Sequence, residues 1–346
     1  MKIMKIKELP EDFIVEELPY DYFLKDNGFG IHYYYWLKKR NIEQQKAIQK
    51  VSKITKKGIK EISFSGIKDK KAITKQLFSV KGKLKQDENG LVYRDDNIEI
   101  KFAGRGKRPV SIGFTLGNKF VITVRDLPPD FELKRSVDKI PNYYDSQRFG
   151  KDNSGIKLGR AIITEDFDKL ISVCKISDFN QLRAKFTKYQ IRFFLSAYGS
   201  YIFNQVLSKI VQLKEECNTI NKKGFVFIKN KNKSKISNEL KVPVPGFGLD
   251  EEINDLKVYK DEIKEIFHEV LERENITERS FIIKSIPEIS NEAVVRSGFI
   301  KVTNFRIVNE GPDELNKGKK KVTVSFELSP GSYATMVLKD LFVDLI

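Results

Sequence analysis

The middle of the chain carries helical patterns that separate two strand-rich ends. Apolar residues recur at helical spacing through residues 189–213 and again through 263–271. Runs rich in aromatic and β-branched residues, which favour strands, precede this region, and a further run returns at 322–328. The sequence pattern changes from strand-rich to helical after Gly150. This order predicts one domain built from both ends of the chain, with a second domain inserted into it.

The two ends predict an α+β fold with a mostly antiparallel sheet. In the helix expected at 42–54, four residues fall on one face: Ala47, Ile48, Val51 and Ile54. In the middle, residues 229–235 predict a solvated loop, and the two prolines of 242–246 predict a rigid turn. A second helix is expected at 334–341, and strands are expected near 13–15, 32–37, 61–64, 76–80, 97–102, 120–124 and 322–328.

The balance of charge favours a polyanionic partner. Lysine and arginine total 63 against 47 aspartate and glutamate, a net charge of +16, and such a surplus promotes contacts with phosphates. A lysine-rich genome or a heat-adapted surface would give the same balance. Cys174 and Cys217 do not form a Cys-x-x-Cys pair, so neither a zinc site nor a disulfide framework is predicted. Without an apolar run of transmembrane length, the sequence predicts a cytoplasmic protein with no membrane partner.

A lysine-rich loop after a predicted strand carries the first candidate site. It spans residues 65–76 and places Asp69 among Lys68, Lys70 and Lys71. These lysines would attract the phosphate backbone of a nucleic acid towards the carboxylate. A solvated turn would show the same charge pattern.

Two further segments suit contacts with a nucleotide. Residues 141–150 combine aromatic rings, amides and Arg148, a mixture that can stack on a flipped base and read its edge. Residues 329–335 form a glycine-containing turn before a helix, where backbone N–H groups can meet a phosphate. The alternatives are a core turn with buried tyrosines for the first and an ordinary strand–helix connection for the second. A fourth segment, 7–13, is a charged lead-in to a strand.

Taken together, in this order and spacing, the four segments resemble the TruD family of pseudouridine synthases. Further matches lie at 117–120, 194–205, 245–246 and Arg296, so the resemblance covers nearly the whole chain. It implies a pseudouridine-synthase-type catalytic domain made of residues 1–154 and 301–346. It also implies an inserted α/β TRUD domain at residues 155–300.

The resemblance assigns residues as well as a fold. It implies Asp69 as the catalytic residue and Lys7 as its neighbour. Two positions depart from the family pattern: Lys339 stands where an arginine is frequent, and Tyr144 where many members have phenylalanine. The other residues expected to line the site are Asn142, Tyr144, Ser332 and Tyr333, and the expected RNA contacts are Lys68, Lys70, Lys71 and Arg148.

The implied activity is the isomerisation of uridine to pseudouridine in tRNA, expected at position 13, with other RNAs as further substrates. No atom enters or leaves in this reaction, so neither a cofactor nor a metal is expected. The sequence leaves open whether Asp69 attacks C1′ or removes a 2′-hydrogen, and it leaves open the oligomeric state. The alternatives are a catalytically silent RNA-binding protein, a basic structural protein of a ribonucleoprotein particle, and a metal-dependent nuclease. The nuclease would need clustered carboxylates, whereas Asp69 is surrounded by lysines.

Overall fold

The computed structural model describes residues 4–26, 28–134, 136–230 and 234–345. By their contacts the residues fall into two units. Residues 139–154, assigned from the sequence to the catalytic domain, belong to unit 2, and the predicted domain bounds remain a prediction. Unit 1 comprises Met1–Asp138, Lys301–Ala334 and Asp344–Ile346, and unit 2 comprises Lys139–Ile300 and Thr335–Val343.

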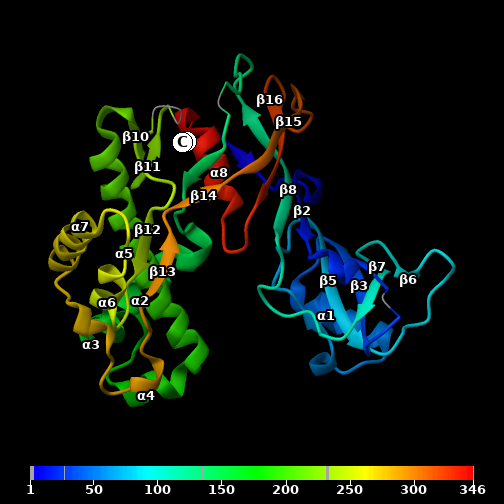
Figure 1. Ribbon diagram of the computed structural model, residues 1–346, viewed down its shortest axis with the longest axis horizontal. Helices are drawn as coiled ribbons and strands as arrows, with labels where there is room; N and C mark the ends of the chain where they lie inside the picture. The colour runs from blue at the N-terminus through cyan, green and yellow to red at the C-terminus, as the bar shows by residue number, and fades with distance from the viewer. Residues whose placement is uncertain (1–3, 27, 135, 231–233, 346) are drawn as a thin grey trace. The chain divides into compact units, whose positions relative to one another are not determined.

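Unit 1 is built on a ten-stranded sheet (Figure 1). The strand order is β15-β16-β8-β2-β5-β3-β7-β6, with β1 beside β8 and β4 beside β5. Among the described residues, the strand pairs of this sheet are antiparallel except β2 with β5, so the predicted α+β fold with a mostly antiparallel sheet is confirmed. The strands are β1 Lys5–Ile6, β2 Phe13–Leu18, β3 His32–Arg40, β4 Ser63–Phe64, β5 Ile73–Lys81, β6 Leu91–Arg94, β7 Ile98–Gly106, β8 Gly117–Leu127, β15 Thr303–Pro312 and β16 Lys320–Leu328.

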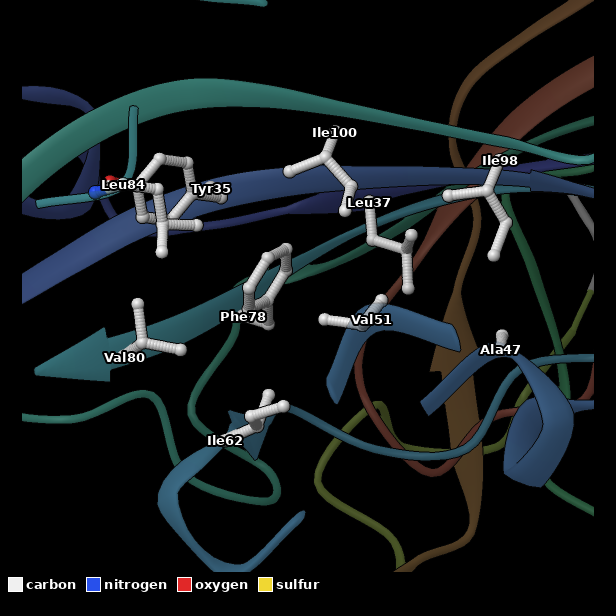
Figure 2. Close-up of a cluster of buried hydrophobic side chains, with 10 residues drawn as sticks. All are labelled: Tyr35, Leu37, Ala47, Val51, Ile62, Phe78, Val80, Leu84, Ile98 and Ile100. Atoms are coloured by element: carbon white, nitrogen blue, oxygen red, sulfur yellow. Dashed lines mark hydrogen bonds between the residues drawn. The ribbon is translucent and has the colours of Figure 1, made fainter. Parts of the chain in front are cut away.

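The hydrophobic core of unit 1 lies between this sheet and helix α1 (Gln44–Thr55) (Figure 2). Tyr35 and Leu37 alternate on β3 and point to the same face, as strand geometry requires. Ala47 and Val51 meet them from α1. The predicted helix face is therefore confirmed for these two residues, and α1 ends at Lys56, which adopts a left-handed conformation with φ 54°.

Unit 2 is organised around the 28-residue helix α5 (Lys188–Glu215), which confirms the long helix predicted at 189–213. Thr187 and Gln190 form a capping box at its start. Helix α2 (Ser154–Ile163) packs closely on α5, because a Cβ at Gly159 would lie 2.1 Å from the Phe194 carbonyl oxygen. The other helices are α3 Phe167–Cys174, α4 Phe179–Lys185, α6 Leu249–Asn254 and α7 Lys260–Arg273.

The part of unit 2 that the structure describes also contains three two-stranded ribbons. They pair β10 (Thr219–Lys222) with β11 (Phe225–Ile228), β12 (Lys241–Val244) with β13 (Val294–Ser297), and β9 (Lys139–Pro141) with β14 (Phe299–Lys301).

Strand β12 corrects one sequence-based expectation. Residues 242–246 were expected to form a rigid turn, but Lys241–Val244 is a strand. Pro243 is tolerated because a two-stranded ribbon leaves one edge unpaired. The predicted loop at 229–235 falls partly outside the described residues, whereas the predicted helix 334–341 is confirmed as α8 (Ala334–Leu341). In the described parts of the chain, every helix is too short or too polar to span a bilayer.

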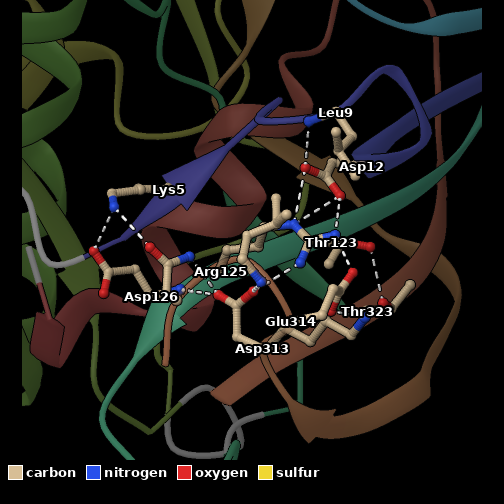
Figure 3. Close-up of polar contacts among 12 residues, drawn as sticks. Lys5, Leu9, Asp12, Thr123, Arg125, Asp126, Asp313, Glu314 and Thr323 are labelled. Atoms are coloured by element: carbon tan, nitrogen blue, oxygen red, sulfur yellow. Dashed lines mark hydrogen bonds and ion pairs between the residues drawn. The ribbon is translucent and has the colours of Figure 1, made fainter. Parts of the chain in front are cut away.

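A buried arginine ties together distant segments of unit 1 (Figure 3). The guanidinium of Arg125 on β8 forms ion pairs with Asp12 and Asp313, both at 2.8 Å, and with Glu314 at 3.0 Å. The Arg125, Asp12 and Asp313 side chains are nearly inaccessible to solvent. Asp12 also accepts a hydrogen bond from the Leu9 N–H, 2.8 Å away. The network therefore fixes the turn η1 (Pro10–Asp12) against β8 and against the β15–β16 hairpin.

We expect Arg125→Ala to lower the free energy of unfolding by about 3 kcal/mol or more, because it leaves two buried carboxylates without a cation. Chemical denaturation followed by circular dichroism measures this loss. The matched control is Arg94→Ala, which removes an exposed ion pair with Glu99 and should cost under about 1 kcal/mol. Equal losses in the two variants would contradict the assigned role of the buried network.

Candidate active site

The loop between β4 and β5 holds Asp69 against a lysine from the N-terminal segment. Lys7 Nζ lies 2.7 Å from Asp69 Oδ1. Lys7 follows β1, which pairs with β8, so this part of the N-terminus is anchored in the sheet. Its backbone is left-handed, with φ 61°, and its ammonium group also lies 4.0 Å from the centroid of the Phe13 ring. The pair predicted from sequence is therefore present in the geometry of unit 1.

Hydrogen bonds of three residues, Lys39, Ser65 and Lys68, hold the loop in place. Lys39 Nζ donates a hydrogen bond to the backbone carbonyl of Asp69 and another, 3.0 Å long, to that of Ile42. The Ser65 hydroxyl donates to Glu17 Oε2 at 2.5 Å. Lys68 Nζ donates to Asn118 Oδ1 at 2.5 Å. Asp69 is thus presented on a loop whose backbone and flanking side chains are both held.

The charged groups beneath the loop are desolvated. Burial lowers the pKa of Lys39 to about 8 and also lowers the pKa of Lys68. Burial likewise raises the pKa of Glu17, against the hydrogen bond from Ser65 and the charge of Lys68. These shifts are the energetic cost of holding the loop in one arrangement.

The lysines predicted to contact RNA have different surroundings. Lys70 and Lys71 are exposed, whereas Lys68 turns inward to Asn118. Lys39 was not predicted as a site residue, although its sequence carries a signal: Tyr35, Leu37 and Lys39 alternate on one face of β3. A lysine that continues a buried alternation is a candidate for a buried charge. Asn118 lies in segment 117–120, which matches the family, but no contact was predicted for it.

The second group of predicted residues lies in unit 2. Asn142 is buried, its Nδ2 donates to the Ser297 carbonyl at 2.8 Å, and its Oδ1 accepts from Arg296 Nη2 at 2.6 Å. The Arg296 guanidinium lies 4.3 Å from the centroid of the Tyr144 ring, and that of Arg148 lies 5.4 Å from it. Unit 2 therefore brings Asn142, Tyr144 and Arg148 together and adds Arg296, to which the sequence analysis assigned no role.

Arg148 is itself held in place by α5. It donates hydrogen bonds to the hydroxyls of Ser196 and of Ser200, the latter 3.1 Å away. Both serines belong to the matched segment 194–205, so the sequence match there corresponds to a contact that orients a guanidinium group.

The remaining predicted residues lie near the C-terminus. Ser332 and Tyr333, both partly buried, follow a turn in which Gly331 has φ 78°. Lys339 on α8 pairs with buried Asp145, Nζ to Oδ1, at 2.5 Å. Burial opposes the charged form of Asp145, but the charge and hydrogen bond of Lys339 outweigh it and keep the pKa of Asp145 below its ordinary value. Lys339 stands where an arginine is frequent in the family, and it still forms an ion pair.

The chemistry of the site is that of a carboxylate with an orienting cation. Within the described ranges, no group of three or more His, Cys, Asp or Glu side chains is arranged to hold a metal ion. A basic protein with a lysine-paired aspartate and a separate ring–guanidinium group suits an enzyme that acts on a nucleic-acid base.

Comparison with known proteins gives the family. The family model described as tRNA pseudouridine synthase D (TruD) matches residues 3–189 and 175–341. A Methanococcus maripaludis protein named "Probable tRNA pseudouridine synthase D 1" is 29% identical over 98% of this chain and 99% of its own length. A Methanocaldococcus jannaschii protein named "Probable tRNA pseudouridine synthase D 2" is 30% identical over 98% of this chain and 92% of its own. The chain belongs to the TruD family.

A solved structure agrees with this assignment at the level of the fold. The crystal structure of a Methanosarcina mazei protein assigned to tRNA pseudouridine synthase D has a TM-score of 0.69 and 23% identity to this chain. It covers 98% of this chain, and the match spans 93% of that protein. The protein is a tRNA pseudouridine synthase, an isomerase that converts uridine to pseudouridine in tRNA.

We expect Lys39→Met to change the pH dependence of stability. Above about pH 8 the folded protein has lost the Lys39 proton, while the unfolded chain keeps it up to about pH 10. Unfolding therefore takes up a proton in this window, and the contribution of Lys39 to the free energy of unfolding rises with pH. Between about pH 7 and about pH 10, the Tm of the wild type should rise relative to that of Lys39→Met.

The matched control for this experiment is Lys38→Met, the exposed neighbour on the same strand. Its Tm difference from the wild type should stay constant over the same pH range. If the Tm difference between the wild type and Lys39→Met were also constant over this pH range, Lys39 would titrate like a solvated lysine.

Proposed function

We propose that this enzyme isomerises the uridine at position 13 of tRNA and that Asp69 is its catalytic residue. The observation that carries the proposal is the ion pair between Lys7 Nζ and Asp69 Oδ1, which are 2.7 Å apart. Hydrogen bonds of Lys39, Lys68 and Ser65 hold the loop that carries Asp69. A carboxylate held in this way needs no reorganisation when a substrate arrives. Among the described residues, Asp69 Oδ2 accepts no hydrogen bond, which leaves this oxygen for the reaction.

The reaction breaks the N1–C1′ bond, turns the uracil and joins C5 to C1′. Asp69 either attacks C1′ or takes the 2′-hydrogen to give a glycal, and an ionised carboxylate serves both routes. The proton on C5 leaves at the end and N1 gains one, so atoms and charge balance without a co-reactant. Lys7 fixes Oδ1 throughout, which makes it a positioning residue.

The target base has to leave its stack, at a cost of a few kcal/mol. We propose that the residues that contact the flipped base are Asn142, Tyr144, Ser332 and Tyr333. Asn142 already uses Oδ1 on Arg296 and one hydrogen of Nδ2 on Ser297. One amide hydrogen is left for the uracil edge.

Two exposed lysines and one partly exposed arginine would supply the electrostatic attraction for RNA. Lys70, Lys71 and Arg148 are the proposed phosphate contacts. We place the enzyme in the cytoplasm, with tRNA as the main substrate and other RNAs as secondary ones.

We expect Asp69→Asn to abolish pseudouridine formation while tRNA affinity stays within a few-fold of wild type, because binding rests on the lysines. Pseudouridine is mapped by chemical labelling and reverse transcription on tRNA treated with each protein. The wild type should give a signal at uridine 13, and so should the control Asp96→Asn, which alters an exposed aspartate of the same unit. Turnover by Asp69→Asn near the wild-type rate would remove Asp69 from the mechanism, and a signal at another uridine would overturn the position.

We expect Lys7→Met to lower kcat roughly tenfold or more, the scale of a lost charged hydrogen-bond partner, with little change in KM or Tm. Steady-state kinetics and thermal unfolding give the three quantities. Lys5→Met is the control. Lys5 lies two residues before Lys7 and forms its ion pair with Asp126 instead of Asp69. An unchanged kcat would place Lys7 outside the mechanism despite its contact with Asp69.

A further inference from the structure

Unit 1 contains a hollow that Asp69 does not line, and three of its six lining residues are aromatic. Its volume is about 370 Å³, within the range of pockets that hold small organic groups. The lining residues are Tyr22, Phe29, Gly106, Lys107, Arg108 and Phe114, and we call this hollow the aromatic pocket.

Two rings of the aromatic pocket are exposed, and one of them, Phe114, packs on a buried ring. Phe29 is 72% exposed and Phe114 is 38% exposed. Phe114 packs edge-on against Phe23, which is 1% exposed, with 5.7 Å between ring centroids. Tyr34 donates a hydrogen bond to the Arg108 carbonyl at 2.7 Å, which holds the opposite wall. Exposed rings that are held in place offer a ready surface for stacking.

The charge around the aromatic pocket favours an anionic occupant. Lys107 and Arg108 are exposed at its edge, and neither forms an ion pair with any described residue. Arg105, two residues before Lys107, lies over the Tyr33 ring at 5.0 Å. A nucleotide combines a flat apolar face with a negative phosphate, so it matches both the rings and the cations.

The aromatic pocket is connected to the catalytic loop through residues 111–118. The Gly113 N–H donates to the Ser65 carbonyl at 3.1 Å, and Asn118 accepts from Lys68 at 2.5 Å. Both partners belong to the loop that carries Asp69. Ile67 on that loop and Ile112 beside Gly113 are 85% and 86% exposed, so apolar surface lies on both connected segments.

We propose that the aromatic pocket binds an unpaired nucleobase of the RNA substrate outside the target uridine, stacked on Phe29 and Phe114. Lys107 and Arg108 contact the adjoining phosphates. The pocket thereby holds a second point of the RNA while the target uridine is at Asp69. This inference rests on the proposed function insofar as it takes the RNA to be delivered to Asp69.

The test measures binding and turnover with the full-length protein. The probes are a tRNA transcript and a fluorescein-labelled oligouridylate of about twelve nucleotides, with Kd from fluorescence polarisation. Phe29→Ala should weaken oligouridylate binding roughly fivefold or more, the effect of one lost stacking contact. With tRNA it should raise KM and leave kcat within about twofold. Phe29 is mostly exposed, so the fold should survive, and the control is Leu24→Ala, which alters a nearby exposed side chain outside the pocket.

A second variant tests the cations independently of the rings. Lys107→Ala combined with Arg108→Ala should weaken binding of both probes and reduce the slope of log Kd against log salt by about two. Lys83→Ala combined with Lys85→Ala removes two exposed charges elsewhere in unit 1 and serves as the control. A slope that falls equally in both double variants would mean that the pocket cations have no specific role.

Unchanged Kd and KM for Phe29→Ala would overturn the proposal and leave a protein partner as the occupant of the aromatic pocket. The result is distinguishable from a failure of the proposed function. If Asp69 is not catalytic, Asp69→Asn stays active while Phe29→Ala still raises KM. If the pocket does not bind RNA, Asp69→Asn is inactive while Phe29→Ala behaves as wild type.

Discussion

The arrangement of unit 1 depends on the charge of Arg125. Its guanidinium joins Asp12, at the N-terminal end of the sheet, to Asp313 and Glu314 in the β15–β16 hairpin. A buried arginine is costly to desolvate unless each side is paired, and the three carboxylates meet that requirement. Because Asp12 also caps the turn that follows Lys7, the same network sets where the Lys7 ammonium group meets Asp69.

Buried charged groups hold the loop of the candidate active site in position. Lys39, Lys68 and Glu17 are all desolvated beneath the loop that carries Asp69, with pKa shifts towards their neutral forms. Apolar residues at these places would be cheaper to bury, but they would not hold the loop carbonyl and side chains by directed hydrogen bonds. The loop thus gains a fixed geometry at the expense of stability, as is common where a reacting group must be preorganised.

Parts of this arrangement were accessible from the sequence. The strand at 32–37 follows from its local composition, and the helix face of Ala47 and Val51 and the long helix at 189–213 follow from local periodicity; the structure confirms all three. The pairing of Lys7 with Asp69 came from the family resemblance, since no local pattern joins residues so far apart. Pro243 was misjudged, because proline is excluded from a strand only where its missing N–H would be needed.

By itself the sequence determined the element types, the basic charge, and the motifs that mark this chain as a TruD family member, because these properties depend on residues near one another in the chain or on their order. Only the tertiary structure decided which charges are buried. It turned Lys68 inward and left Lys70 and Lys71 outside, placed Lys39 under Asp69, and gathered Phe29 and Phe114 around one pocket. Burial and ion pairing arise from contacts between distant segments, and local periodicity carries no information about which segments meet.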